Sequence, residues 1–196
     1  MKRMHLPRRA QGLTLIELLM FIVVVGIALA AMLRIFTAAT TASADPMIRH
    51  QQLAIAESLL REVQLMPFTW CDPDDANVET ATSAVVSATG CATTVESSGP
   101  ESGETRYGPS NYFDNVNDYA GLSMSGIRDI SNTVVSGLSG YSASVAVVPA
   151  VLDSVLATEA LQITVTVVGP GDDLVNLKNP IRLQGWRTRY APTSPF

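Results

Sequence analysis

A long apolar segment dominates the first part of the chain. From Leu18 to Leu33 no residue carries a charged or polar side chain. The wider segment 13–33 matches the roughly 20 residues that an α-helix needs to cross a bilayer. The pattern therefore predicts a membrane-spanning helix over residues 13–33. Glu17 is the exception, because a carboxylate at the head of such a segment is costly in lipid unless a partner neutralises it.

A second periodic segment follows a short polar stretch. Asp45 before Pro46 is typical of a helix start, and Pro46 is expected to kink or briefly interrupt the path between two helical halves. Beyond it, residues recur at spacings of three to four and predict an amphipathic helix over 46–66. Together with 13–33 it makes an N-terminal helical region, residues 13–66, that ends before Pro67. The stripe consists of Ile48, Gln52, Ile55, Leu59 and Val63, widened by Ala56, Leu60 and Met66.

The C-terminal part of the chain alternates with a period of two. Residues 141–149, 160–169 and 181–190 alternate apolar with polar side chains and are separated by turn signals, which predicts three antiparallel strands with one buried face. The amphipathic helix has the stripe needed to cover that face. The expected fold class is therefore α+β, with a long hydrophobic-then-amphipathic helix packed on an antiparallel sheet. The predicted inward residues are Tyr141, Ala143, Val145, Val147, Leu161, Ile163, Val165, Val167, Ile181 and Leu183.

The region between the helix and these strands is irregular. Residues 68–140 are rich in Ser, Gly, Asn and Asp, which favours loops and turns. A short strand is expected at Ala84–Ala88. We also expect the final segment, 187–196, to be an exposed tail. Residues 67–196 then form one β-rich globular head.

Charge is distributed unevenly along the chain. The net charge is −5, but Lys2, Arg3, Arg8 and Arg9 precede the apolar segment, whereas all 18 acidic residues follow position 12. A basic flank stays in the cytoplasm, so the rest of the chain is expected on the outer side of the membrane. A body this acidic repels phosphate, so nucleic acid is not expected as a partner.

Cys71 and Cys91 lie in the part expected outside the cytoplasm. Oxidising compartments favour disulfides, and a bridge closing about twenty residues adds roughly 3 kcal/mol in the chain-entropy model. Two unpaired thiols or a metal site are the alternatives. Metal is disfavoured because the only histidines are His5, in the basic leader, and His50.

The residues around Glu17 form a recognisable motif. Residues 12–17 read Gly-Leu-Thr-Leu-Ile-Glu, after a short basic leader and before the apolar helix. This order resembles the processing signature of type IV prepilins and of type II secretion pseudopilins. In that family a membrane-embedded peptidase cuts after the glycine and methylates the new N-terminus. The family prefers Phe at the first mature position, so Leu13 is a mild departure.

The resemblance implies roles for four residues. Residues 1–12 would be a cleaved cytoplasmic leader, with the cut between Gly12 and Leu13 and N-methylation at Leu13. Glu17 falls on the family's fifth mature position and is expected, with Thr14, to act in assembly. A carboxylate in one subunit can neutralise the new amine of a neighbour, and an unpaired charge at low dielectric is expensive. Such a pair would set the register between subunits.

Further segments resemble a narrower group. Residues 44–68, "CDPDD" (71–75) and "YFDNVNDYAGLS" (112–123) are similar to a minor pilin of the mannose-sensitive haemagglutinin (MSHA) pilus. The stretch "LAIAESLLREV" (53–63) also resembles minor pseudopilins of type II secretion, which remain the alternative. The resemblance implies no cofactor, and it implies other pilin or pseudopilin subunits, the prepilin peptidase/methyltransferase and the bacterial inner membrane as partners. The head would lie in the periplasm before the subunit joins a pilus or pseudopilus.

Two other readings of the N-terminus stay open. "ASA" at 42–44 fits a signal-peptide cleavage site that would make Asp45 the mature terminus. That reading needs an unusually long apolar segment with Glu17 and Arg34 inside it. A plain membrane anchor, with Met1 retained, is the other reading.

Other chemistry is poorly supported by the sequence. Oxygen-bearing side chains in "YFDNVNDY" could hold Ca²⁺, but the segment lacks the glycine and distal glutamate of an EF-hand, and side chains bonding their own backbone explain it more simply. No hydrolase, metalloprotease or phosphate-loop motif is present, so no enzymatic activity is expected, and an adhesive aromatic surface stays a guess. The calcium candidates are Asp114, Asn115, Asn117 and Asp118.

Overall fold

The structure is a computed structural model that describes residues 14–171, 174, 179–190 and 194, without the side chains of residues 39–45. Its first element is the helix α1, Leu15–Leu65. The chain divides into two compact units, Met1–Pro46 and Met47–Phe196. The boundary falls inside α1, so each unit is described by itself.

The helix α1 continues through Pro46. The helix start expected at Asp45 and Pro46 is therefore wrong, and no interruption separates two helices there. Proline removes one N–H from the backbone ladder. The helical segments before and after it are long enough to continue despite that loss.

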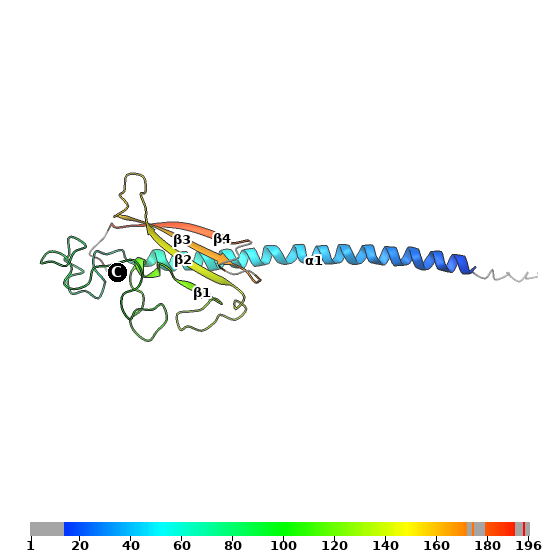
Figure 1. Ribbon diagram of the computed structural model, residues 1–196, viewed down its shortest axis with the longest axis horizontal. Coiled ribbons are helices and arrows are strands. Elements are labelled where there is room, and N and C mark those ends of the chain that lie inside the picture. The colour runs from blue at the N-terminus through cyan, green and yellow to red at the C-terminus, as the bar shows by residue number, and fades with distance from the viewer. Residues whose placement is uncertain (1–13, 172–173, 175–178, 191–193, 195–196) are drawn as a thin grey trace, which may run out of the picture. The chain divides into compact units, whose positions relative to one another are not determined.

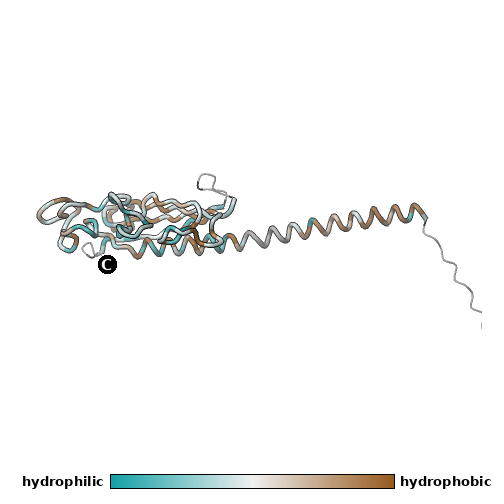
Figure 2. The backbone as a smooth tube through the Cα atoms, turned by 90° about the horizontal axis from the view of Figure 1, so that it is seen from below, coloured by the Kyte–Doolittle hydropathy of each residue, from teal (hydrophilic) through white to brown (hydrophobic). Residues whose placement is uncertain are grey.

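The first unit contains an apolar helical stretch. Residues Leu15–Ala38 are long and apolar enough to cross a membrane, and Figure 2 shows the hydrophobic colour along this part of α1. Its large side chains are exposed, for example Ile22 and Phe36. A signal sequence near the N-terminus has the same length and composition as a membrane-spanning helix.

The second unit is built on a four-stranded antiparallel sheet in the order β1-β2-β3-β4. Consecutive strands are neighbours, which makes the sheet a simple meander (Figure 1). The strands are β1 (Ser123–Ser125), β2 (Ser142–Pro149), β3 (Ala160–Val168) and β4 (Ile181–Thr188), and a short 3-10 helix, η1 (Val116–Tyr119), precedes β1.

The core lies between this sheet and the C-terminal part of α1. Ile55, Leu59 and Val63 of the helix are buried with the inward residues of β2 and β3. Every predicted inward residue of those two strands is at most 5% exposed, while Ile181 and Leu183 of β4 pack at the core's edge. The α+β fold class and the buried face are therefore confirmed.

Gly185 lets β4 approach the helix closely. A Cβ at this position would lie 3.0 Å from Cδ1 of Leu60 and 2.4 Å from Nε2 of Gln64. The contact with Gln64 is shorter than real Cβ contacts and the one with Leu60 is tight, so a side chain at position 185 would force these two side chains to shift. Sequence alternation alone gave no role to this residue.

Three expectations about the head need correction. Ala84–Ala88 is not a strand, because only an isolated bridge joins Val86 to Cys91 there. The short strand β1 was not expected, since three residues are too few to show a period. The C-terminal segment is not simply exposed: β4 includes 187 and 188, and Arg189 lies over the rings of Phe68 and Trp70 at 3.7 and 4.2 Å.

Candidate functional site

Thr14 forms the N-terminal cap of α1. Its hydroxyl accepts a hydrogen bond from the backbone N–H of Glu17 at 3.4 Å, and its carbonyl accepts from the N–H groups of Glu17 and Leu18 at 3.1 and 3.2 Å. A threonine followed three positions later by glutamate is the sequence signature of a capping box. Thr14 therefore has a local structural role that the processing motif alone does not reveal.

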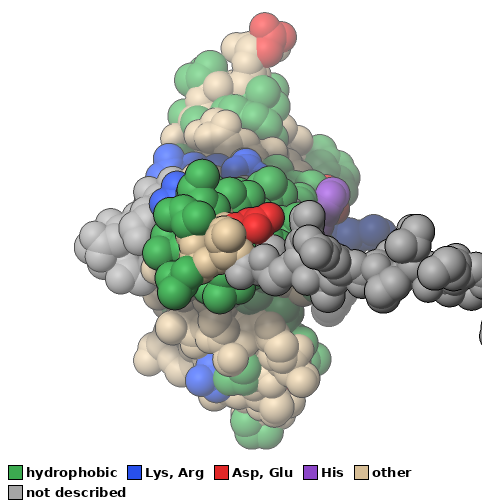
Figure 3. Space-filling model, turned by 90° about the vertical axis from the view of Figure 1, so that its right-hand side faces the viewer, with side chains coloured by type: hydrophobic (Ala, Val, Ile, Leu, Met, Phe, Trp, Pro, Cys, Tyr) green, Lys and Arg blue, Asp and Glu red, His purple; other side chains and the backbone are tan. Residues whose placement is uncertain are grey.

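Glu17 lies in the first turn of α1 among apolar side chains. The neighbouring residues Ile16 and Leu18 are exposed, as are the large hydrophobic residues along the next turns. Figure 3 shows hydrophobic side chains gathered around one acidic group. An acidic residue favours a helix N-terminus through the helix dipole. In lipid that contribution is small against the cost of an unpaired carboxylate.

The proposed cleavage site itself, Gly12 and Leu13, lies outside the described residues. The same holds for the basic leader.

Comparison with known families identifies this N-terminal region. Residues 7–33 match the family described as the prokaryotic N-terminal methylation motif. The chain therefore has a type IV prepilin-like N-terminus, and the match covers well under half of its length. Comparison with curated proteins and with solved structures gave no match.

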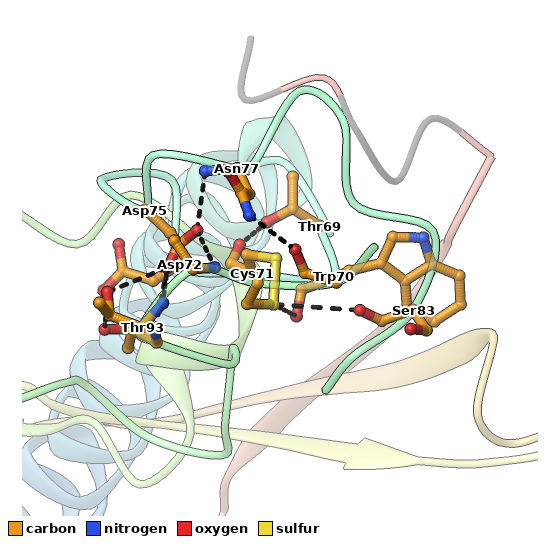
Figure 4. The surroundings of a disulfide bond; sticks show 12 residues. Thr69, Trp70, Cys71, Asp72, Asp75, Asn77, Ser83 and Thr93 are labelled. Atoms are coloured by element: carbon orange, nitrogen blue, oxygen red, sulfur yellow. Dashed lines mark hydrogen bonds between the residues drawn. A yellow bond between two sulfur atoms is a disulfide. The ribbon is translucent and has the colours of Figure 1, made fainter. Parts of the chain in front are cut away.

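A disulfide joins Cys71 to Cys91, with 5.4 Å between the two Cα atoms. The bridge closes a loop whose backbone hydrogen bonds form turns, and both cysteines are fully buried in a small apolar cluster with Val78 and Ala81. The loop therefore has its own core (Figure 4).

Asp75 ties the two sides of this loop together. Its carboxylate accepts backbone hydrogen bonds from Thr94, Ala92, Thr93 and Asn77 at 2.7–2.9 Å, and Figure 4 shows it between Asn77 and Thr93. Burial alone would raise the pKa of Asp75, but these N–H donors hold the pKa far below its ordinary value. Asp75 is therefore a structural anion.

A buried ion pair connects α1 to the loops. Arg106 donates from Nε and Nη2 to the two carboxylate oxygens of Glu62 at 2.7 and 2.8 Å. The hydroxyl of Tyr119 donates to the same carboxylate at 2.9 Å. Burial lowers the pKa of Arg106, but the Glu62 carboxylate outweighs it and the net pKa lies above its ordinary value. This bidentate pair fixes the loop onto the helix.

Six carboxylates, from Asp72, from the loop 96–104 and from residues 114–118 at η1, form two clusters. They form two groups of three, and within each group one ligand atom per residue lies within 4.8 Å of the others. One group is Glu96, Glu101 and Asp118, and the other is Asp72, Glu104 and Asp114.

Burial, helped by the charges of neighbouring carboxylates, raises the pKa of several acidic groups here. Burial, followed by the charge of Asp118, raises the pKa of Glu96 to about 10. Burial likewise raises the pKa of Asp118 to about 8. The backbone N–H groups of Asn115 and Asp114 lower this pKa, while the charges of Glu104 and Glu101 raise it further. The pKa values of Glu104 and Asp114 rise to about 7, chiefly through burial. Negative charge is therefore costly here.

The four calcium candidates from the sequence are divided by the structure. Asp114 and Asp118 fall in different carboxylate groups. Asn115 is the N-cap of η1, where its side chain accepts from the N–H of Asn117, and its amide donates to Thr69 at 2.7 Å. The simpler explanation, that these side chains bond to nearby backbone, holds for Asn115 and for Oδ2 of Asp118.

The sequence did not reveal the ion pair between Glu62 and Arg106 or the glutamates of the two carboxylate groups. Glu62 and Arg106 are 44 positions apart, and Glu96, Glu101 and Glu104 stand in a loop segment without a recognisable motif. Only the spacing Asn-x-x-Asp over 115–118 carried a signal, since it is a capping pattern. The guanidinium of Arg189 lies over the ring of Trp70, 4.2 Å from its centre.

Proposed function

We propose that the chain is a minor pilin subunit of a type IV pilus, cut between Gly12 and Leu13 and methylated at Leu13. The observation that carries this proposal is the match of residues 7–33 to the N-terminal methylation motif. The apolar helical stretch Leu15–Ala38 and the α+β head support it. In this account residues 1–12 are the leader, 13–66 the helix and 67–196 the head.

Location and partners follow from the same proposal. The precursor would wait in the bacterial inner membrane with residues 13–33 spanning it and the head in the periplasm. The prepilin peptidase/methyltransferase would process it, and the apolar part of α1 would then pack against other pilins. The subunit would contribute structure and no catalysis.

Within the pilins, we propose the MSHA type, with a role like that of the minor pilin MshD. This proposal rests only on the resemblance noted above for residues 44–68, 71–75 and 112–123. A minor pseudopilin of type II secretion is the alternative, favoured by residues 53–63. Deleting the gene separates the two, because loss of surface pili supports the first and loss of protein secretion with intact pili supports the second.

Glu17 is the residue that would join subunits. After cleavage, Leu13 carries a cationic amine at the edge of the hydrocarbon, and Glu17 of a neighbouring subunit can neutralise it. The pair matters because an unpaired charge in a dry environment is strongly destabilising. Thr14 contributes by capping the helix on which Glu17 stands.

The test replaces the charge and keeps the shape. In a host with the assembly system, the Glu17→Gln chain should be cleaved normally, yet its amount in sheared fibres should fall at least about tenfold, because breaking a buried pair costs about 3–5 kcal/mol. Glu79→Gln, at an exposed position of the head, should behave as the wild type. Normal incorporation of Glu17→Gln would remove the assembly role.

A further inference from the structure

The group formed by Glu96, Glu101 and Asp118 contains buried oxygen atoms that no donor satisfies. Both carboxylate oxygens of Glu96 and Oδ1 of Asp118 are inaccessible to solvent and have no hydrogen-bond partner among the described residues. Asp118 is only 1% exposed. Buried anions without donors are costly, because they lose hydration and gain nothing in return.

The backbone holds two of these carboxylates in place. Oδ2 of Asp118 accepts from the N–H groups of Asp114 and Asn115 at 2.9 and 2.7 Å. Oε1 of Glu101 accepts from the backbone N–H and hydroxyl of Ser97 at 3.3 and 3.2 Å. Asp118 is thus oriented through one oxygen, and its other oxygen, Oδ1, has no donor among the described residues.

The nearby cations already have partners. Arg106 forms its ion pair with Glu62 at 2.7 Å, and Arg189 forms one with Glu159 at 3.4 Å. Arg189 is also held between Phe68 and Trp70. The charge of Arg189 also acts on Glu96, but neither oxygen of Glu96 has a hydrogen-bond partner among the described residues, so no arginine there satisfies these oxygens.

We propose that Glu96, Glu101 and Asp118 bind a calcium ion. Carboxylate oxygens without histidine or cysteine suit a hard cation. Ca²⁺ takes 6–8 oxygens at about 2.3–2.6 Å, so two oxygens on opposite sides of one ion lie about 4.6–5.2 Å apart. The ligand atoms lie within 4.8 Å of one another, which one ion can bridge without a rearrangement of the backbone.

Calcium fits this group better than magnesium. Mg²⁺ requires a near-ideal octahedron at about 2.0–2.1 Å and keeps several waters, whereas these three side chains come from irregular loops and η1. Ca²⁺ tolerates irregular geometry and fills its shell with carbonyls and water. The inference uses the head alone and holds whether or not the chain assembles into a pilus.

The test is thermal unfolding of the full chain in detergent, at neutral pH, with Ca²⁺ or with EGTA. A saturating Ca²⁺ concentration, about a hundredfold above the dissociation constant, should raise the Tm by about 5–10 °C. Calorimetric titration with CaCl₂ should give one ion bound to this group. The same concentration of Mg²⁺ should give a smaller shift.

Glu96→Gln distinguishes binding from damage to the fold. In EGTA this variant should melt at about the wild-type Tm or above it, because burial raises the pKa of Glu96 so far that it already carries no charge at neutral pH. Its response to Ca²⁺ should be lost, because glutamine cannot ionise to meet the ion. Glu101→Gln should behave alike and serves if Glu96→Gln does not fold. Glu79→Gln, an exposed control, should keep the full response.

Three results would overturn the proposal. The first is an unchanged Tm in about 10 mM Ca²⁺, well above the dissociation constants of weak extracellular sites. The second is a full Ca²⁺ response in both glutamine variants. The third is an equal response to Mg²⁺, which would replace calcium with an unselective cation site.

Discussion

At the scale of single residues, Asp75 carries a charge that the fold depends on. Four backbone N–H groups from both sides of the disulfide loop donate to its carboxylate. These donors stabilise the ionised form, so the folded pKa lies below the unfolded value of about 3.9. A depressed carboxylate pKa stabilises the fold above the unfolded pKa, and that stability is lost as the pH falls through the acid range.

Asp75→Asn should therefore destabilise the head at neutral pH. We expect a loss of about 2–4 kcal/mol in the free energy of unfolding, because buried N–H donors lose a charged acceptor. The difference from the wild type should shrink below about pH 4, because there the carboxylate of the unfolded wild-type chain takes up a proton that the folded one does not. Urea unfolding between neutral and acidic pH measures it.

The control for this prediction is Asp153→Asn. Asp153 is exposed and has a φ of 52°, which asparagine also adopts. Its effect should stay small at every pH. A difference between Asp75→Asn and the wild type that does not change with pH would contradict the proposed role of the charge.

Residue roles could be predicted where they depend on near neighbours in the sequence. Glu17 stood out because it interrupts an apolar segment. Glu62 and Arg106 could not be paired in advance, because the fold brings together positions far apart and neither has a distinctive local pattern. The buried oxygens of Glu96 were equally invisible, since burial of a loop glutamate depends on packing from other segments.

At the scale of elements, the stripe of α1 holds the sheet. Leu59 is 5% exposed in the core, while Leu65 on the same helix is 72% exposed. Leu59→Ala should cost about 2–5 kcal/mol through lost burial and the cavity left behind. Leu65→Ala removes the same atoms at an exposed position at the end of α1 and should cost little, so chemical denaturation of the two variants shows the effect of burial.

Equal effects of these two substitutions would contradict the packing of α1 on the sheet. The periodicity of the helix and of β2, β3 and β4 predicted this packing, because a repeated pattern survives many tertiary contexts. β1 has three residues and η1 has four, which is too few for a period. The predicted helix start at Pro46 was wrong, because the pair Asp45-Pro46 is typical of helix starts but here lies inside the longer helix α1.

At the scale of the whole chain, two units of different character share one helix. The first is apolar and exposed and bears the methylation motif, and the second is a folded head with its own core. An exposed apolar helix of this length needs lipid or other apolar helices around it. A subunit that moves from membrane to fibre would have lipid around this helix first and other apolar helices afterwards.

Mass spectrometry of the mature N-terminus tests the central claim most directly. The chain should be recovered from membranes of a host with a prepilin peptidase. The account predicts N-methyl-Leu13 as the first residue, replaced by an uncut chain when the peptidase is deleted or Gly12 is changed to a bulky residue. A terminus at Asp45 would identify a secreted domain, and an intact Met1 in the presence of the peptidase would identify a simple anchor. Either result would contradict the pilin account.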